Sequence, residues 1–115
     1  MSDIYDLLVS MGLNKNYLGY EYIAFAVGML KESEQPVQMK ALYLEVAKHF
    51  CTTPQCVERD IRTAVRILLK NEHLKCLRES RRVKTGPGNA EVLYFLTFLW
   101  EKYTKNQPGG IEKIV

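Results

Sequence analysis

The chain has 115 residues, of which 47% are hydrophobic, and a formal net charge of +3. This length supports one domain with a single core and is too short for two. The longest apolar runs, at 23–30 and 92–100, fall far short of the roughly 20 residues that cross a bilayer, and the acidic start lacks the basic region of a secretory signal. These features predict a cytoplasmic protein with no membrane partner.

The first third of the chain predicts two helices. Residues 4–11 form a short amphipathic helix that Gly12 ends, and residues 16–32 form a longer helix whose apolar repeat is interrupted by glycines. The positions expected to face the core from the first helix are Ile4, Leu7, Leu8 and Met11. A polar linker that contains a proline follows at 31–38.

Residues 41–70 indicate a short helix, a tight turn and a longer helix, which is the pattern of a helix-turn-helix. The first of these helices carries an apolar stripe of Leu42, Val46 and Phe50, with Tyr43 and Ala47 beside it. In the turn, Thr53 can cap the second helix. Pro54 suits the first turn of that helix, because the missing N–H costs nothing there and the φ angle is already helical.

The second helix, at about 53–71, is amphipathic. Its apolar side consists of Val57, Ile61, Ala64, Val65 and Leu68. The side chains left for a partner, which we take as the candidate DNA-binding residues, are Thr53, Gln55, Cys56, Glu58, Arg59, Arg62, Thr63 and Arg66. A helix of this kind can enter a DNA major groove with its polar side first.

The distribution of charge is more informative than the net charge. Residues 1–39 have a net charge of −3, whereas residues 56–84 hold nine Lys/Arg and four Asp/Glu, a net charge of +5. Such a basic segment is expected where phosphates approach a protein. The alternative is a solvated helix face with internal ion pairs, and Glu58 with Arg62 has the i,i+4 spacing of such a pair.

The region after the helix-turn-helix permits two folds. Residues 71–80 suggest one short helix and 81–89 a basic turn rich in Gly and Pro. If 91–103 were a strand, the protein would be a winged helix, and if it is a helix, the domain is all-α; the uninterrupted apolar stretch favours a helix. We expect residues 1–105 to form the domain and 106–115 to be a flexible tail.

Neither a metal nor catalysis is indicated. Three cysteines, an odd number, fit a reducing compartment better than a disulfide framework. The candidate ligands for a zinc site would be His49, Cys51, Cys56, His73 and Cys76. Their spacing argues against it, because structural zinc usually has two short-spaced ligand pairs. No nucleophile motif and no glycine-rich phosphate loop are present, so we expect no enzyme and no cofactor.

A signature in the helix-turn-helix resembles that of a known family. It consists of Phe50-Cys51-Thr52-Thr53 followed by Val57-Glu58-Arg59-Asp60-Ile61-Arg62-Thr63-Ala64-Val65. Further matches are Gly19-Tyr20-x-Tyr22-Ile23, Leu42-Tyr43-x-x-Val46-Ala47-Lys48-x-Phe50 and Pro87-x-Asn89-x-Glu91. Together they are similar to the C-terminal DNA-binding effector domain of the sporulation response regulator of endospore-forming bacteria.

This resemblance implies an all-α bundle of about six helices, which makes 91–103 a helix. It implies that the second helix of the motif reads bases, with Glu58, Arg59 and Arg62 at the family's exposed Glu, Arg and Arg. It also assigns contact with an RNA polymerase sigma factor to about 72–86, where Arg78, Arg81, Arg82 and Lys84 could contact either phosphates or the polymerase. Tandem binding to adjacent sites is implied as well, so we expect a weak or DNA-induced homodimer on double-stranded DNA.

The chain also departs from the family pattern. Cys56 stands where the family usually has an arginine, Leu44 stands where it usually has a proline, and the histidine that often precedes the glycine-tyrosine pair is absent. The given sequence has no room ahead of the first helix for the phosphoacceptor receiver domain that the family usually carries. We therefore expect either an excised domain or a stand-alone effector that is not phosphorylated in cis, and the Met-Ser-Asp start favours the second. The rival interpretation is an adaptor that contacts a sigma factor or another regulator without high-affinity DNA binding.

Overall fold

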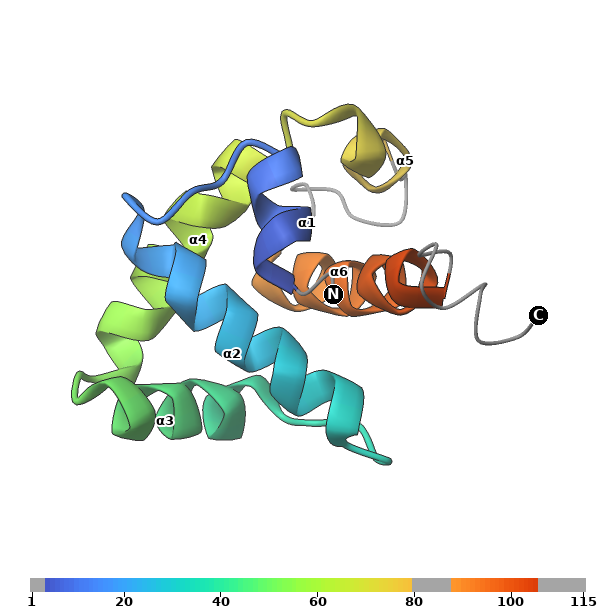
Figure 1. Cartoon of the computed structure of the whole chain (residues 1–115). Coiled ribbons are helices and arrows are strands. Elements are labelled where there is room, and N and C mark those ends of the chain that lie inside the picture. The colour runs from blue at the N-terminus through green and yellow to red at the C-terminus, as the bar shows by residue number, and fades with distance from the viewer. Residues whose placement is uncertain (1–3, 80–87, 106–115) are drawn as a thin grey trace.

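The structure, a computed structural model, describes residues 4–79 and 88–105, and every regular element in these two ranges is a helix (Figure 1). The elements are α1 (Ile4–Ser10), α2 (Leu18–Glu32), α3 (Met39–Phe50), α4 (Pro54–Leu68), the 3-10 helix η1 (Glu72–Leu74), α5 (Lys75–Arg78) and α6 (Asn89–Lys105). The all-α prediction is therefore confirmed, and the segment 91–103 lies within a helix.

Helix α2 lies at the centre of the fold and contacts α1, α3, α4 and α6 (Figure 1). The core that these helices share includes residues with no exposed surface, among them Leu8, Ile23, Leu42, Ile61 and Leu93. Burying each such side chain contributes about 1.5–3 kcal/mol. The four positions predicted to face the core from the first helix are all buried, although α1 ends one residue before Met11.

The contact between α2 and α4 is unusually close because of Gly19. A Cβ atom at this position would lie 2.5 Å from the backbone oxygen of Asp60 and 2.7 Å from Cβ of Ala64. Both distances are well below van der Waals contact, so only a residue without a side chain fits. The position of α4 in the fold therefore depends on this glycine.

The turn between α3 and α4 is short and capped at both ends. Cys51 ends α3 in the left-handed conformation, with φ 56° and ψ 48°, and the Thr52 N–H donates to the Ala47 carbonyl at 2.9 Å. On the other side, Thr53 Oγ1 accepts a hydrogen bond from the Cys56 N–H at 3.2 Å, and Pro54 begins α4. The predicted cap is confirmed, and the two helices form a helix-turn-helix.

The region after α4 differs from the prediction of one short helix. The segment is divided between η1 and α5, and Leu74, at the end of η1, is fully buried and anchors this segment to the core. The expected basic turn at 81–89 lies mostly outside the described residues, as does the expected tail at 106–115. No described helix combines the length and apolar character needed to span a bilayer.

Candidate DNA-binding surface

Helix α4 is divided lengthwise into a buried side and an exposed side. The buried residues are Val57, Ile61, Ala64, Val65 and Leu68, the five that the helical spacing predicted. They pack against α2 and α3, so the helix cannot rotate about its axis without exposing several apolar side chains. The orientation of its polar side is therefore fixed by the core.

The candidate residues share the other side of the helix. The exposed members are Thr53, Gln55, Glu58, Arg59, Arg62, Thr63 and Arg66, whereas Cys56 is half-buried. The structure thus brings together on one helix face the candidates that the sequence placed there. Of the more distant candidates, Arg81, Arg82 and Lys84 lie outside the described residues, and only the backbone of Arg78 is described.

The exposed face contains two ion pairs. Nη2 of Arg62 lies 3.2 Å from Oε1 of Glu58, and each of these side chains is about half exposed. Nε of Arg59 lies 3.5 Å from Oδ1 of Asp60, whose side chain is only 14% exposed. Exposed pairs of this kind contribute about 0–1 kcal/mol. They can therefore order the arginines without preventing them from binding a partner.

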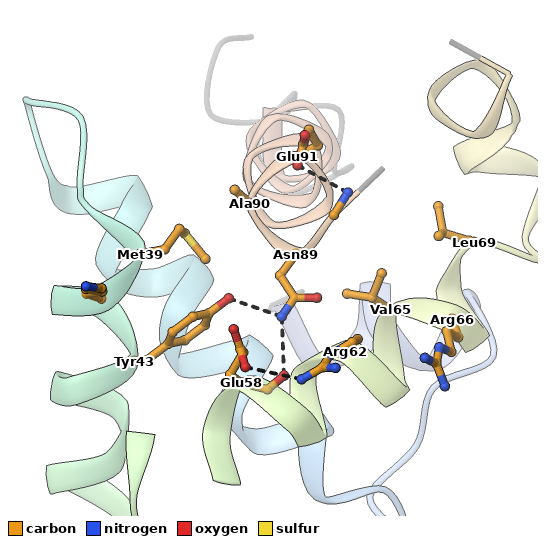
Figure 2. Close-up of a pocket in the computed structure, with 12 residues that line it drawn as sticks. Met39, Tyr43, Glu58, Arg62, Val65, Arg66, Leu69, Asn89, Ala90 and Glu91 are labelled. Carbon is orange, nitrogen blue, oxygen red and sulfur yellow. Dashed lines mark hydrogen bonds and ion pairs between the residues drawn. The ribbon is translucent and has the colours of Figure 1, made fainter. Parts of the chain in front are cut away.

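A hollow of about 720 Å³ lies beside this face, between α3, α4 and the start of α6 (Figure 2). Its charged lining consists of three basic residues and two glutamates: Lys40, Arg62, Arg66, Glu58 and Glu91. Lys40 also lines a second hollow of about 360 Å³ between the N-terminal halves of α3 and α4. Lys40 was not among the residues predicted to bind DNA, although a basic residue in the first turn of α3 could have been considered as a phosphate contact.

The start of α6 is joined to both helices of the motif. Nδ2 of Asn89 donates to the Tyr43 hydroxyl at 3.1 Å and to the backbone carbonyl of Glu58 at 3.3 Å (Figure 2). Burial raises the pKa of Tyr43, and the hydrogen bond from Asn89 partly offsets this by lowering it. Both residues belong to the sequence motifs named above, but those motifs do not predict a contact between them.

The residues considered for zinc have other surroundings. His49 stacks on Phe25 with ring centroids 4.2 Å apart, and Cys51 is exposed in the turn. Hydrogen bonds from the side chains of Thr53 and Thr52 lower the pKa of Cys56. Within 4–79 and 88–105 no three His, Cys, Asp or Glu side chains are grouped to hold a metal. The side chains of His73 and Cys76 are not described.

The fold and this surface define the class as a helix-turn-helix domain whose second helix presents a polar, arginine-rich face. Residues 4–98 match the family described as "Sporulation initiation factor Spo0A C terminal", and the chain belongs to this family. The family is the DNA-binding effector domain of a sporulation regulator, not a family of enzymes, so the chain is a DNA-binding transcription regulator domain. No solved structure matches the chain.

Proposed function

We propose that this domain recognises a specific DNA sequence by placing α4, the recognition helix, in the major groove. The observation that carries the proposal is the division of α4, in which five apolar residues fix the helix against the core and the opposite face presents the arginines. A straight helix of this width fits the major groove of B-form DNA.

The chemistry of the exposed face suits base recognition. Arg59 and Arg62 can each donate two hydrogen bonds to O6 and N7 of guanine. Glu58 can accept a hydrogen bond from N4 of cytosine, or it can orient Arg62 through the 3.2 Å ion pair. Gln55, Thr63 and Arg66 extend the same face along the helix.

Contacts outside the recognition helix supply affinity that does not depend on sequence. We assign Lys40 to the DNA backbone because it is exposed at the start of α3, beside the hollow that flanks α4. We assign about 72–86, with Arg78, Arg81, Arg82 and Lys84, to phosphates or to a polymerase sigma factor. Residues 1–105 are proposed to carry the activity, with 106–115 as a dispensable tail.

Selection from random duplex DNA, repeated at two salt concentrations, tests the proposed function. We expect one sequence motif to be enriched at both. Arg59→Ala and Arg62→Ala should each weaken binding to the selected duplex by about 1–3 kcal/mol and should weaken binding to unrelated DNA less. Affinities are measured by fluorescence anisotropy at a fixed salt concentration.

Lys102→Ala is the matched control, because it removes one positive charge at the far end of α6. The helical rise places Lys102 about 20 Å along the axis from the start of α6. On a duplex that carries a single copy of the selected site, this variant should bind almost as the wild type does. If Arg59→Ala and Arg62→Ala lost the same affinity for the selected and for unrelated DNA, these residues would be phosphate contacts. Failure to select any sequence motif would favour the adaptor function.

A further inference from the structure

The contact between Asn89, Tyr43 and Glu58, which we call the Asn89 junction, joins three helices at one point. Asn89 is the first residue of α6, Tyr43 lies in α3, and Glu58 lies in the second turn of α4. The bonded residues are 46 and 31 positions apart in the chain. Figure 2 shows the Asn89 side chain pointing from α6 into the angle between the other two helices.

The amide of Asn89 is chemically suited to this position. A side-chain NH₂ group has two N–H donors, and here it bonds both the Tyr43 hydroxyl at 3.1 Å and the Glu58 carbonyl at 3.3 Å. A carbonyl oxygen has two lone pairs, so the Glu58 carbonyl can accept this bond in addition to a helical one. Aspartate would be of the same size but would lack both donors.

The junction acts on the residue that orients an arginine of the recognition helix. The Glu58 backbone accepts the bond from Asn89, while the Glu58 carboxylate holds Arg62 at 3.2 Å. The start of α6 is itself held, because Oε1 of Glu91 accepts a hydrogen bond from the Gly88 N–H at 3.2 Å. Asn89 therefore has a fixed base from which to hold the backbone of α4.

We propose that Asn89 and Tyr43 are positioning residues for DNA recognition, which hold Glu58 and Arg62 in the register needed to read bases and do not themselves contact DNA bases. This inference rests on the proposed function. It extends the recognition site from the exposed face of α4 to a junction in the hollow beside that face. Loss of the junction should reduce discrimination between DNA sequences more than it reduces general affinity for DNA.

The test compares Tyr43→Phe and Asn89→Ala with Tyr94→Phe. Tyr94 is the matched control because its hydroxyl also joins α6 to another segment, accepting from the Val37 N–H at 3.2 Å, but does so away from α4. Binding to the selected duplex and to a scrambled duplex is measured at one salt concentration, with thermal unfolding recorded for each variant. Arg62→Ala serves as the reference for lost base reading.

Tyr43→Phe and Asn89→Ala should each weaken binding to the selected duplex by about five- to tenfold, the size of one or two hydrogen bonds, and binding to the scrambled duplex by less than about twofold. The double variant should bind the selected duplex at most about twofold more weakly than the single variant with the lower affinity, because both changes break the same junction. Tyr94→Phe should keep the wild-type ratio of the two affinities.

Two outcomes would overturn the inference while leaving the proposed function intact. In one, Arg62→Ala loses discrimination but both junction variants keep the wild-type ratio. In the other, the junction variants weaken both duplexes equally, which would assign the contact to general stability. A wild-type protein that does not discriminate between the duplexes would overturn the proposed function itself. If Asn89→Ala fails to fold, Tyr43→Phe, which removes a single oxygen atom, still decides the question.

Discussion

The fold changes the ionisation of Tyr43. Its side chain is half-buried against α4, and burial raises the pKa of its hydroxyl above the ordinary value. The hydrogen bond from Asn89 opposes this shift, because donation to the oxygen favours the tyrosinate. The residue therefore reports on the state of the Asn89 junction in the absence of DNA.

Because the pKa of Tyr43 is higher in the folded state, unfolding at high pH releases a proton. The contribution of Tyr43 to stability is complete below pH about 10 and decreases as the pH rises above it. We therefore expect the free energy of unfolding of the wild type to fall more steeply above pH about 10 than that of Tyr43→Phe. Urea unfolding at a series of pH values measures this, and parallel curves for the two proteins would contradict it.

Cys56 lies at the position where the resemblance described in the sequence analysis implies an arginine. Its half-buried side chain lies in the first turn of α4, next to exposed Gln55. A longer, charged side chain at this edge could extend past the helix toward a phosphate or a base. We therefore expect the small thiol at position 56 to contribute less affinity for DNA than an arginine would.

Cys56→Arg should tighten DNA binding and steepen its dependence on salt by about one unit of the logarithmic slope, as expected for one more phosphate contact. Cys56→Gln is the control, because it lengthens the side chain without a charge and loses the same thiol. Titrations at several salt concentrations measure both quantities. Equal affinities of the Arg and Gln variants would show that this turn does not face DNA.

At the scale of the elements, α2 approaches α4 closely at Gly19. The backbone oxygen of Asp60 would be 2.5 Å from an added Cβ, and a backbone atom cannot rotate aside as a side chain can. Gly28, in the same helix, has nothing within 4 Å of its Cβ position. Position 19 therefore requires a glycine, whereas position 28 in the same helix has room for a side chain.

Gly19→Ala should lower the free energy of unfolding by about 1–3 kcal/mol, because α4 must move away from α2. Gly28→Ala should raise it by about 0.5–1 kcal/mol, because alanine loses less backbone entropy in a helix. Thermal and urea unfolding of both variants measure these changes. An increase in the free energy of unfolding for both variants would contradict the close contact between α2 and α4.

At the scale of the whole molecule, one recognition helix contacts only a few base pairs, which is too little for specificity in a genome. A second copy on an adjacent site would supply the rest. Helix α6 offers a surface for such a contact, since Phe98 is 48% exposed. We expect a monomer or weak dimer in solution and cooperative binding of two copies on DNA.

Titration of duplexes that carry one or two copies of the selected site measures this cooperativity. The protein should bind two adjacent sites with higher affinity per site than a single site. Changing the spacing by about five base pairs, half a helical turn, should abolish this gain in affinity. Phe98→Glu should reduce the gain and leave single-site affinity unchanged. Equal affinity per site at every spacing would contradict cooperative binding and would indicate either independently binding monomers or an adaptor.

The sequence by itself determined the helix-turn-helix and the two sides of α4. Both depend on local chemistry. Thr53 favours the N-cap of a helix and Pro54 favours its first turn, whatever the rest of the fold. A repeat of 3.6 residues then separates the buried side of the helix from its exposed side. The pair of Glu58 and Arg62 could also be predicted, because i,i+4 neighbours on a helix are in contact whatever surrounds them. For 91–103, apolar on most sides, periodicity was ambiguous, and the family resemblance indicated the helix.

Only the tertiary structure decided how these helices meet. The split of 71–80 into η1 and α5, the requirement for a glycine at position 19 and the Asn89 junction all arise from contacts between segments far apart in the chain. Propensity and periodicity describe each residue with its near neighbours and carry no information on such contacts. The bond from Asn89 to the backbone of Glu58 exists because the packing of α3, α4 and α6 brings the two residues within 3.3 Å.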